Sequence, residues 1–421
     1  MITTRYGSVA LAFAALSPFF FTVASGQDAA GPPATKASAE SIEEIVVIGS
    51  RIRRVNIEGP SPVTRIDAEE IKASGFVSVP DLLRGITENG GETQSQQSFS
   101  GSSFTPGAQQ VDLRGLGPNH TLVLVNGRRI ADFPLPFKGR SNFTDISNIP
   151  LGMIESVEVL SGSASAIYGS DAISGVVNFN LKKKIDGLQV DYRYGTTEQG
   201  GGASHRFTLV GGWSTGAFDS IVGVEFMDKK PVWAYDRTIQ DSTADNPTTQ
   251  FPLARRDFLR YDPVEDAYVD PGQATCQALS YLNWGSTYYA SRPNWGPYDP
   301  NTDSYLPGHF CGSNTSIGFG TIESKRRGVN IYSSLNFQLT DTTRLFADIQ
   351  FGHSKIGIFR DVLQWQFEDA NGSEDGNFFN QASGALDSWF RHFTPEEMGG
   401  LNNGMIRSTQ RTFSITPGIK G

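Results

Sequence analysis

The sequence has few cysteines, few histidines and little positive charge. Its 421 residues include 2 Cys, 5 His and 35 Lys+Arg against 44 Asp+Glu, which gives a formal net charge of −9. Two cysteines exclude a disulfide-dense scaffold and a zinc site built from four thiolates. The acidic balance argues against a protein that coats nucleic acid, because neutralising phosphates requires an excess of Lys and Arg.

Long apolar runs are also missing. The mean hydropathy is −0.28, and no run reaches the roughly 18 apolar residues of a spanning helix, which excludes an ordinary helical membrane protein. A membrane β-barrel is not excluded, because its strands are apolar on one face only. The length is ample for a packed core and suggests two or three domains.

The N-terminus has the pattern of a secretory signal peptide. Arg5 supplies positive charge, residues 9–23 are almost all apolar, and small residues follow at 24–26. The pattern predicts a signal peptide over residues 1–26, because the apolar core is too short for a membrane anchor and no stop-transfer pattern follows. The mature chain is therefore expected to leave the cytoplasm.

Cys276 and Cys311 are candidates for a disulfide bond. Exported chains reach oxidising surroundings, in which disulfides form and persist. The alternative is a metal site, which needs His or carboxylate partners at short spacing, and only His309 is near. The histidines show no ligand spacing, so the sequence predicts neither a metal site nor a cofactor.

A flexible leader is predicted over residues 27–59. Residues 27–41 are rich in Ala, Pro, Gly and Ser and contain few apolar anchors. Within residues 43–50 there is a short β-forming run that comprises Glu44, Ile45, Val46, Val47 and Ile48. It is either the first strand of the next domain or an exposed strand that pairs with the sheet edge of another protein.

Residues 60–184 predict an α+β domain. Residues 67–74 have an N-cap residue and an acidic first turn, which predict a short helix. Asn126 and Gly127 predict a tight hairpin, because both residues tolerate the positive φ that such turns need. Apolar and polar residues alternate over 154–160 and predict a strand.

No catalytic site is apparent in this domain. The Gly-rich segment at 115–120 has His120 where a dinucleotide-binding loop needs its third Gly. Residues 162–169 lack the Gly-Lys-Ser/Thr ending of a phosphate loop and the flanking glycines of a nucleophile elbow. The sequence therefore predicts that the protein is not an enzyme.

From residue 185 to 421 the apolar residues recur with a period of two. Leu188, Val190 and Tyr192, for example, alternate with Gln189 and Asp191. Segments of about ten residues, apolar on one face and with aromatics near their ends, are typical of antiparallel transmembrane β-barrel strands. The alternative is a soluble sandwich with one hydrated face.

These strands are interrupted by a segment at about 229–320, which is too long for an ordinary loop. Between its two cysteines it concentrates aromatic residues, among them Tyr281, Trp284, Tyr288, Tyr289, Trp295 and Tyr298. They are candidates for stacking against a flat, apolar or sugar-like ligand. The alternative is that they pack the loop against itself.

Four ordered motifs between residues 43 and 184 resemble the plug domain of TonB-dependent outer-membrane receptors. They are Glu43–Arg51, Val111–Gly115, Thr121–Arg129 and the pair Ile154–Leu160 and Ala166–Asn178. Residues 185–421 are similar to the family's barrel only in pattern. The resemblance implies a plug inside a barrel of about 22 strands. It also implies that residues 45–48 form the TonB box, which the transducer TonB grips and pulls.

The resemblance also implies roles for plug residues. Arg114 would form ion pairs with barrel carboxylates, and three glycines would serve tight turns. Ser161 stands where the family often has Arg or Lys, so one expected charge contact with the barrel lacks its cation. The residues expected to shape the plug or hold it to the barrel are Arg114, Gly115, Asn126, Gly127, Tyr168, Gly169 and Gly175.

The implied function is import across the outer membrane of a Gram-negative cell, energised by the TonB complex. The implied partners are TonB, outer-membrane lipid and a ligand of the siderophore-iron, cobalamin or saccharide class. No additional domain precedes the TonB box, which argues against the transcription-signalling subclass. The alternative is a secreted or surface-exposed β-rich adhesin or ligand-binding protein without transport.

The length conflicts with a complete barrel. Residues 185–421 supply about 6–7 strands of the expected 22 or so, and an open sheet would expose unpaired edges to lipid. We therefore expect a truncated chain or a fragment, with an incomplete barrel, that does not transport alone.

Overall fold

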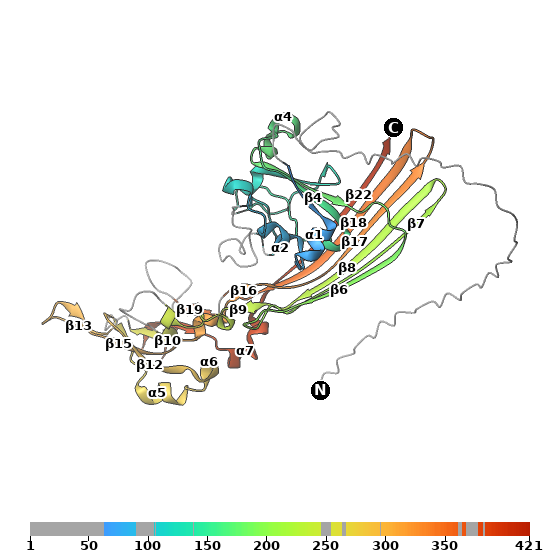
Figure 1. Ribbon diagram of the computed structural model, residues 1–421. Coiled ribbons are helices and arrows are strands. Elements are labelled where there is room, and N and C mark those ends of the chain that lie inside the picture. Colours follow the sequence, from blue (N-terminus) through green and yellow to red (C-terminus); the bar gives the residue numbers. More distant parts are fainter. Residues whose placement is uncertain are drawn as a thin grey trace, which may run out of the picture. The chain divides into compact units, whose positions relative to one another are not determined.

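The computed structural model describes residues 63–89, 105, 107–137, 139–245, 254–262, 267–294, 296–360, 364–367, 378–381 and 384–421. The predicted signal peptide, the leader and the run Glu44–Ile48 lie outside the described residues, and so does Trp295. Figure 1 shows the arrangement of the strands and helices along the chain.

A five-stranded mixed sheet forms the first part of the fold. Its strands are β1 (Val63–Asp67), β2 (Thr121–Val125), β3 (Arg128–Arg129), β4 (Ile154–Leu160) and β5 (Gly175–Leu181). Their order is β1-β4-β5-β2-β3, with β2 and β5 parallel and the other neighbours antiparallel. The strand predicted over 154–160 is therefore confirmed as β4.

Short helices complete what we call the mixed-sheet domain (residues 63–181). They are α1 (Ala68–Ala73), α2 (Val79–Arg84) and α4 (Ser165–Tyr168), with 3-10 turns η1 (Leu113–Gly115), η2 (Pro118–His120), η3 (Leu151–Met153) and η4 (Ser170–Ala172). The predicted helix after Asp67 is confirmed as α1. The hydroxyl of Ser78 caps α2 by accepting a hydrogen bond from the Asp81 N–H at 3.4 Å. None of the described helices is both long and apolar enough to cross a bilayer.

The core of this domain lies between its helices and the middle of the sheet. Leu82 and Leu83 of α2 belong to one buried cluster with Val157, Val177 and Phe179 of β4 and β5. The β-branched and aromatic residues suit the pleated surface of the central strands, and the helices cover it.

The predicted hairpin is confirmed at the turn between β2 and β3. Asn126 and Gly127 have φ of 51° and 74°, the two successive positive values that a tight hairpin requires. The Asn126 N–H donates to the Phe179 carbonyl at 2.9 Å, and the Gly127 N–H donates to Asn178 Oδ1 at 2.9 Å. These two bonds fix the hairpin to β5.

Six long antiparallel strands form a second sheet, which we call the large sheet. They are β6 (Gly187–Gly195), β7 (Ser204–Thr215), β8 (Phe218–Lys229), β17 (Lys325–Gln338), β18 (Arg344–Ile358) and β22 (Ile406–Lys420). Their order is β22-β18-β17-β8-β7-β6, with β6 and β22 at the edges. In the described residues the two edges do not pair, so the sheet is open. The expected fold class, an α+β domain followed by antiparallel strands, is confirmed.

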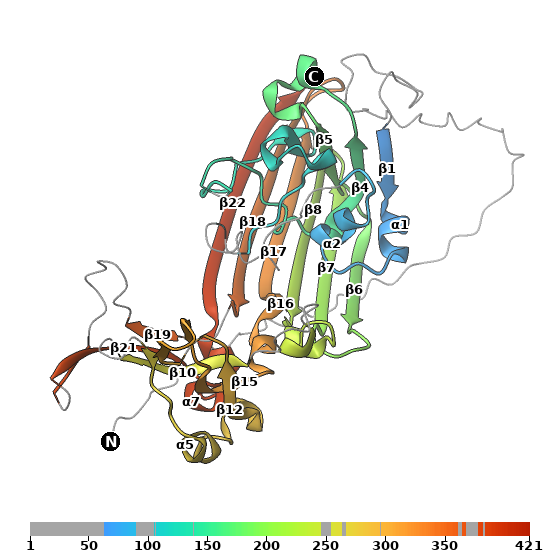
Figure 2. The ribbon, with the colours of Figure 1, turned by 90° about the vertical axis from the view of Figure 1, so that its left-hand side faces the viewer.

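The large sheet has one polar and one apolar face. Along β7, Arg206, Thr208 and Val210 are buried, whereas Phe207 and Leu209 between them are exposed. Figure 2 shows the strands side by side, with the mixed-sheet domain over one face. The opposite face exposes large apolar side chains, which include Leu188, Val190, Tyr192, Tyr194, Trp213, Val222, Ile331, Phe351, Phe413 and Ile419. Among the described residues no second sheet covers that face, so the arrangement is not the sandwich considered above.

Two segments with structure of their own connect the long strands. The first, between β8 and β17, holds β9 (Val232–Trp233), β10 (Arg255–Asp262), β11 (Ala267–Tyr268), β12 (Thr287–Arg292), β13 (Tyr298–Asp299), β14 (Ser304–Tyr305), β15 (Gly308–Ser313), β16 (Thr321–Glu323), α5 (Gln273–Ala278), α6 (Leu282–Gly285), η5 (Ala234–Asp236), η6 (Thr243–Asp245) and η7 (Ser316–Phe319). The second, between β18 and β22, holds β19 (Gln364–Phe367), β20 (Phe378–Asn380), β21 (Ala385–His392), α7 (Pro395–Met398) and η8 (Leu401–Gly404).

The long loop expected at about 229–320 is therefore a folded unit. A sheet ordered β12-β15-β10-β21-β19 joins the two segments, because β10 of the first pairs with β21 of the second. At the base of the first segment, β9 pairs with β16 and Lys229 forms an ion pair with Glu323 at 2.9 Å. The segment is anchored where it leaves the large sheet.

The mixed-sheet domain is tightly packed around Gly175. Its φ is 149°, and a Cβ atom there would lie 2.3 Å from the Leu160 carbonyl oxygen and 2.7 Å from Leu113 Cδ1. We expect Gly175→Ala to lower the free energy of unfolding by about 2–4 kcal/mol, measured by urea denaturation of the full chain in detergent. Gly127→Ala is the control, because Gly127 has open space around it and should lose only about 1 kcal/mol. Equal losses would contradict the tight packing at Gly175.

Candidate functional site

The candidate functional site is the contact surface between the mixed-sheet domain and the polar face of the large sheet. Val210, Ile221 and Tyr332 of the large sheet are at most 1% exposed and belong to the same apolar cluster as Met153 and Ile154. Polar contacts surround this shared core, and two groups of them form attachments on different strands.

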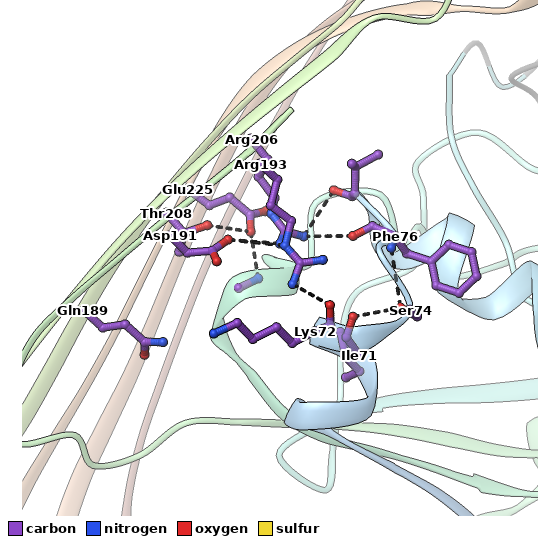
Figure 3. Close-up of polar contacts among 12 residues, drawn as sticks. Ile71, Lys72, Ser74, Phe76, Gln189, Asp191, Arg193, Arg206, Thr208 and Glu225 are labelled. Atoms are coloured by element: carbon purple, nitrogen blue, oxygen red, sulfur yellow. Dashed lines mark hydrogen bonds and ion pairs between the residues drawn. The ribbon is translucent and has the colours of Figure 1, made fainter. Parts of the chain in front are cut away.

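The first attachment is the arginine clamp, formed by Asp191 and Arg193 on β6 and Arg206 on β7. One carboxylate oxygen of Asp191 lies 3.6 Å from Arg193 Nε and 3.3 Å from Arg206 Nη2. Arg193 Nη2 donates to the Lys72 carbonyl at 3.0 Å, and Arg206 Nη1 donates to the carbonyls of residues 76–77 at 3.4 and 3.5 Å. Figure 3 shows both guanidinium groups reaching from the strands to the connection between α1 and α2.

The clamp satisfies groups on both sides of the interface. The end of α1 leaves carbonyl groups without helical partners, and the clamp supplies donors to this region. Arg206 is 3% exposed, and a buried cation needs a nearby anion and hydrogen-bond acceptors. Asp191 provides the charge, and the backbone of the mixed-sheet domain provides the acceptors.

Glu225 on β8 supports the same region from the neighbouring strand. It is 4% exposed, and its carboxylate accepts a hydrogen bond from the Gly152 N–H at 2.8 Å. A Cβ atom on Gly152 would lie 2.6 Å from Thr208 Cγ2. Glycine at this position lets the backbone approach close enough for the carboxylate to reach the N–H.

The second attachment, which we call the hairpin latch, is formed where the hairpin of β2 and β3 contacts β17 and β18. Arg128 Nη1 lies 2.9 Å from Asp348 Oδ2, and its guanidinium lies 4.3 Å from the centre of the Phe346 ring. Asn126 Nδ2 donates to the Tyr332 hydroxyl at 3.2 Å. An ion pair and a cation–π contact therefore hold one side chain of the hairpin against the sheet.

Arg114 contacts its own domain in the described part of the chain, and its implied ion pair with barrel carboxylates stays a prediction. Its guanidinium donates to the Ser161 carbonyl inside the mixed-sheet domain, and among the described residues no carboxylate pairs with it. Its φ is 62°, so the turn directs the side chain toward the loop after β4. Among the described residues, Arg128 forms an ion pair between the domain and the large sheet.

The other predicted residues of this domain lie at turns. Gly115, Gly169 and Gly175 have φ of 68°, 87° and 149°, values that glycine adopts most readily. Tyr168 ends α4, and its carbonyl accepts a hydrogen bond from Arg129, which also pairs with Asp171. The two neighbouring arginines of the hairpin thus serve different contacts.

A cavity of about 250 Å³ lies beside the clamp, between α1 and the first strands of the large sheet. Lys72 and Glu69 line it from the helix, and Gln189 and Thr208 line it from the strands. Lys182 completes the lining, and burial lowers the pKa of its ammonium group. Ile71, Leu151 and Val210 also line the cavity, so charged and apolar side chains share the space next to α1.

The predicted aromatic residues fall into two groups in the structure. A disulfide joins Cys276 to Cys311, and so links α5 to β15. Tyr289 stacks on His309 with ring centres 4.8 Å apart, and its hydrogen bond to Asp270 raises the pKa of Tyr289 to about 12. The more exposed residues are Tyr281, Trp284, Tyr288 and Tyr298.

Trp284 belongs to a chain of rings that sequence reasoning found only in part. Its ring centre lies 5.1 Å from that of Tyr235 and 4.8 Å from that of Phe319. Tyr235 stacks on Trp233, which contacts Phe359 at the end of β18. Phe319 and Phe359 are buried, whereas Tyr235 and Trp284 are exposed. We call these two residues the exposed aromatic surface.

The comparison with protein families bears on the first part of the chain. Residues 55–176 match the model of the TonB-dependent Receptor Plug Domain. The match takes in most of the mixed-sheet domain. From here on, the mixed-sheet domain is called the plug.

Solved structures similar to this chain include siderophore receptors. A variant of the ferric enterobactin receptor PfeA of Pseudomonas aeruginosa shares 19% identity, with 72% of this chain and 34% of that chain covered and a TM-score of 0.41. The siderophore receptor PirA of P. aeruginosa shares 18%, covering 71% and 51%, with a TM-score of 0.28. PiuA of Acinetobacter baumannii shares 16%, covering 74% and 38%, with a TM-score of 0.34. The chain thus spans between a third and a half of the length of these structures.

Sequence reasoning missed the partners of the plug. Asp191, Arg193 and Arg206 were visible only as polar residues of alternating strands. Their position on the polar face of the strands was the one signal that they could contact the plug. The residues that accept their hydrogen bonds could not be predicted, because every residue has a backbone carbonyl.

Asp191→Asn tests the arginine clamp. The substitution removes the negative charge that Arg193 and Arg206 share, and it should weaken this attachment by about 1–3 kcal/mol because Arg206 is buried while Asp191 is partly solvated. We expect faster amide hydrogen exchange over residues 72–78 in the full chain. Asp186→Asn is the control, because Asp186 is exposed next to the same strand. The clamp would be unsupported if both variants exchanged alike.

Arg128→Ala tests the hairpin latch, with Arg129→Ala as the matched neighbour. Removing the Arg128 side chain abolishes the ion pair with Asp348 and the contact with Phe346. A double-mutant cycle with Asp348→Ala should give a coupling energy of about 1–2 kcal/mol in urea unfolding of the plug. The same cycle with Arg129→Ala should give a value near zero, because Arg129 pairs within the plug. Equal coupling in the two cycles would refute the assignment.

Proposed function

We propose that this chain acts as part of a TonB-dependent outer-membrane receptor that imports a scarce ligand into the periplasm, although it is not expected to transport alone. One observation carries the proposal. The plug covers the polar face of the large sheet, and two polar attachments flank a limited apolar contact. A polar contact can be exchanged for hydrogen bonds to water at small net cost in free energy. A plug held in this way covers the polar face of the sheet and can still be released.

The apolar face of the large sheet supports a location in the outer membrane. Apolar and aromatic side chains point away from the plug on the strands of this sheet, as on the lipid side of a membrane barrel. Export through the signal peptide predicted over residues 1–26 fits this location. Outer-membrane lipid is accordingly one partner of the proposed receptor.

The proposed energy source is TonB, acting on Ile45–Ile48. This segment precedes β1, which is an edge strand and pairs only with β4 among the described strands. A pull on the chain before Val63 therefore reaches β1 first and α1 next. The arginine clamp follows at residues 72–77, where it opposes further release.

The proposed ligand contacts lie in the segments that join the long strands. The exposed aromatic surface offers flat rings, which suit a ligand with a stackable face. Siderophore-iron, cobalamin and saccharides all remain candidate classes for the imported ligand.

Val46→Pro tests the proposed TonB box. Proline has no N–H group to donate and fixes φ, so the segment should no longer pair with a sheet edge of TonB. We expect the variant to lose capture of the purified periplasmic domain of TonB in outer-membrane vesicles. In cells, uptake of radiolabelled ferric siderophores, cobalamin or oligosaccharides through a complete receptor that carries the substitution should fall at least tenfold, while surface binding of the same probe is retained.

Val46→Ile is the control, because it keeps the N–H group and the β-branched side chain. It should behave as the unaltered protein in both assays. If Val46→Pro still captured TonB and supported uptake, the proposal for this segment would be wrong. An adhesin would bind its target equally well in all three forms.

A further inference from the structure

An unusual backbone conformation holds the exposed aromatic surface. Asn283 and Trp284 in α6 have φ of 52° and 58°, the left-handed region that side-chain-bearing residues rarely adopt. Two successive residues in this region persist only when surrounding contacts determine them. The conformation also sets the direction in which the Trp284 side chain leaves the backbone.

The contact that fixes this backbone comes from the other connecting segment. Glu396 in α7 accepts hydrogen bonds from the Asn283 N–H at 3.1 Å and from the Trp284 N–H at 2.8 Å, one on each carboxylate oxygen. It stands 113 residues after Asn283 in the chain. Figure 1 shows α6 and α7 next to each other.

Glu396 is not part of the capping box of α7, so its carboxylate is available to accept these two hydrogen bonds. Thr394 and Glu397 form the capping box of α7, in which the Glu397 carboxylate accepts from the Thr394 N–H at 2.9 Å. On the other side, Asn283 is 1% exposed and its amide donates to Thr287 Oγ1 at 3.0 Å. Glu396 and Asn283 are therefore each held in place by residues of their own segment.

We propose that Glu396 is a positioning residue of the exposed aromatic surface. It fixes the orientation of Trp284 and makes this surface depend on the segment between β18 and β22. The inference rests on the proposed function, in which this surface contacts ligand. Because coupling between two sites is reciprocal, a change at Trp284 also alters α7.

A second contact reinforces the link. Leu401 and Met405, which follow α7, belong to the same buried cluster as Trp233, Phe319 and Phe359. Phe319 in turn contacts the Trp284 ring. The carboxylate contact and this buried cluster thus join the same two segments just before the chain enters β22.

Glu396→Ala in the full chain, held in outer-membrane vesicles, tests the proposal. We expect amide hydrogen exchange at residues 283 and 284 to become at least tenfold faster and quenching of Trp284 fluorescence by acrylamide to increase. Trp284→Phe, measured in parallel, identifies the fluorescence of Trp284. Glu198→Ala removes an exposed carboxylate elsewhere and should change neither signal.

The reciprocal variant is Trp284→Ala, which should speed exchange over residues 394–399. Unchanged exchange at residues 283 and 284 in Glu396→Ala, or at 394–399 in Trp284→Ala, would overturn the proposal.

Catechol, titrated as a flat aromatic probe, separates this outcome from failure of the proposed function. Glu396→Ala should weaken its binding about three- to tenfold; equal binding would refute the positioning role. If catechol does not bind the unaltered protein, the ligand-contacting role of Trp284 is wrong, and the exchange results still decide the link.

Discussion

Charged side chains on the polar face of the large sheet need partners, and the plug supplies them. Arg206 and Glu225 are almost fully buried, and burying an unpaired charge is costly. The plug meets this need with backbone groups: carbonyls near the end of α1 for the arginine and the Gly152 N–H for the carboxylate. The position of α1 and of the turn before β4 is thus set by the charges on the strands opposite.

The same constraint explains why small residues line the contact. Backbone groups reach a charge on the sheet only if the two surfaces approach closely. Gly152 of the plug lies against Thr208, and a Cβ atom on Gly223 of β8 would lie 2.1 Å from Met153 Sδ. A glycine on each side therefore permits the contact, and apolar packing around Met153 surrounds it.

Local patterns in the sequence predicted the elements of the fold, whereas contacts between residues far apart in the chain became apparent only in the structure. Alternation predicted which residues of the long strands are exposed, and Asn126-Gly127 predicted the hairpin, because both signals depend on neighbouring residues. The hydrogen bond from Arg114 to the Ser161 carbonyl was not predicted, since a backbone carbonyl has no side-chain signature. The pairing of β10 with β21 was also out of reach, because the long segment offers no local signal for a strand so distant in the chain.

Under the proposed function, a pull from the N-terminus would load the two attachments of the plug unequally. The arginine clamp holds residues 72–77, which follow α1 directly, whereas the hairpin latch holds Arg128 beyond the centre of the sheet. Between them lie β4 and β5, whose residues Val157 and Phe179 are fully buried. Stripping the edge strand β1 breaks its pairing with β4 and the packing of Val63 and Ile66 against the core, and it leaves these central strands in place. The cavity lined by α1 and by β6 and β7 would widen when α1 departs, while the latch still holds the rest of the plug. Partial release is therefore the least costly response of this fold to force.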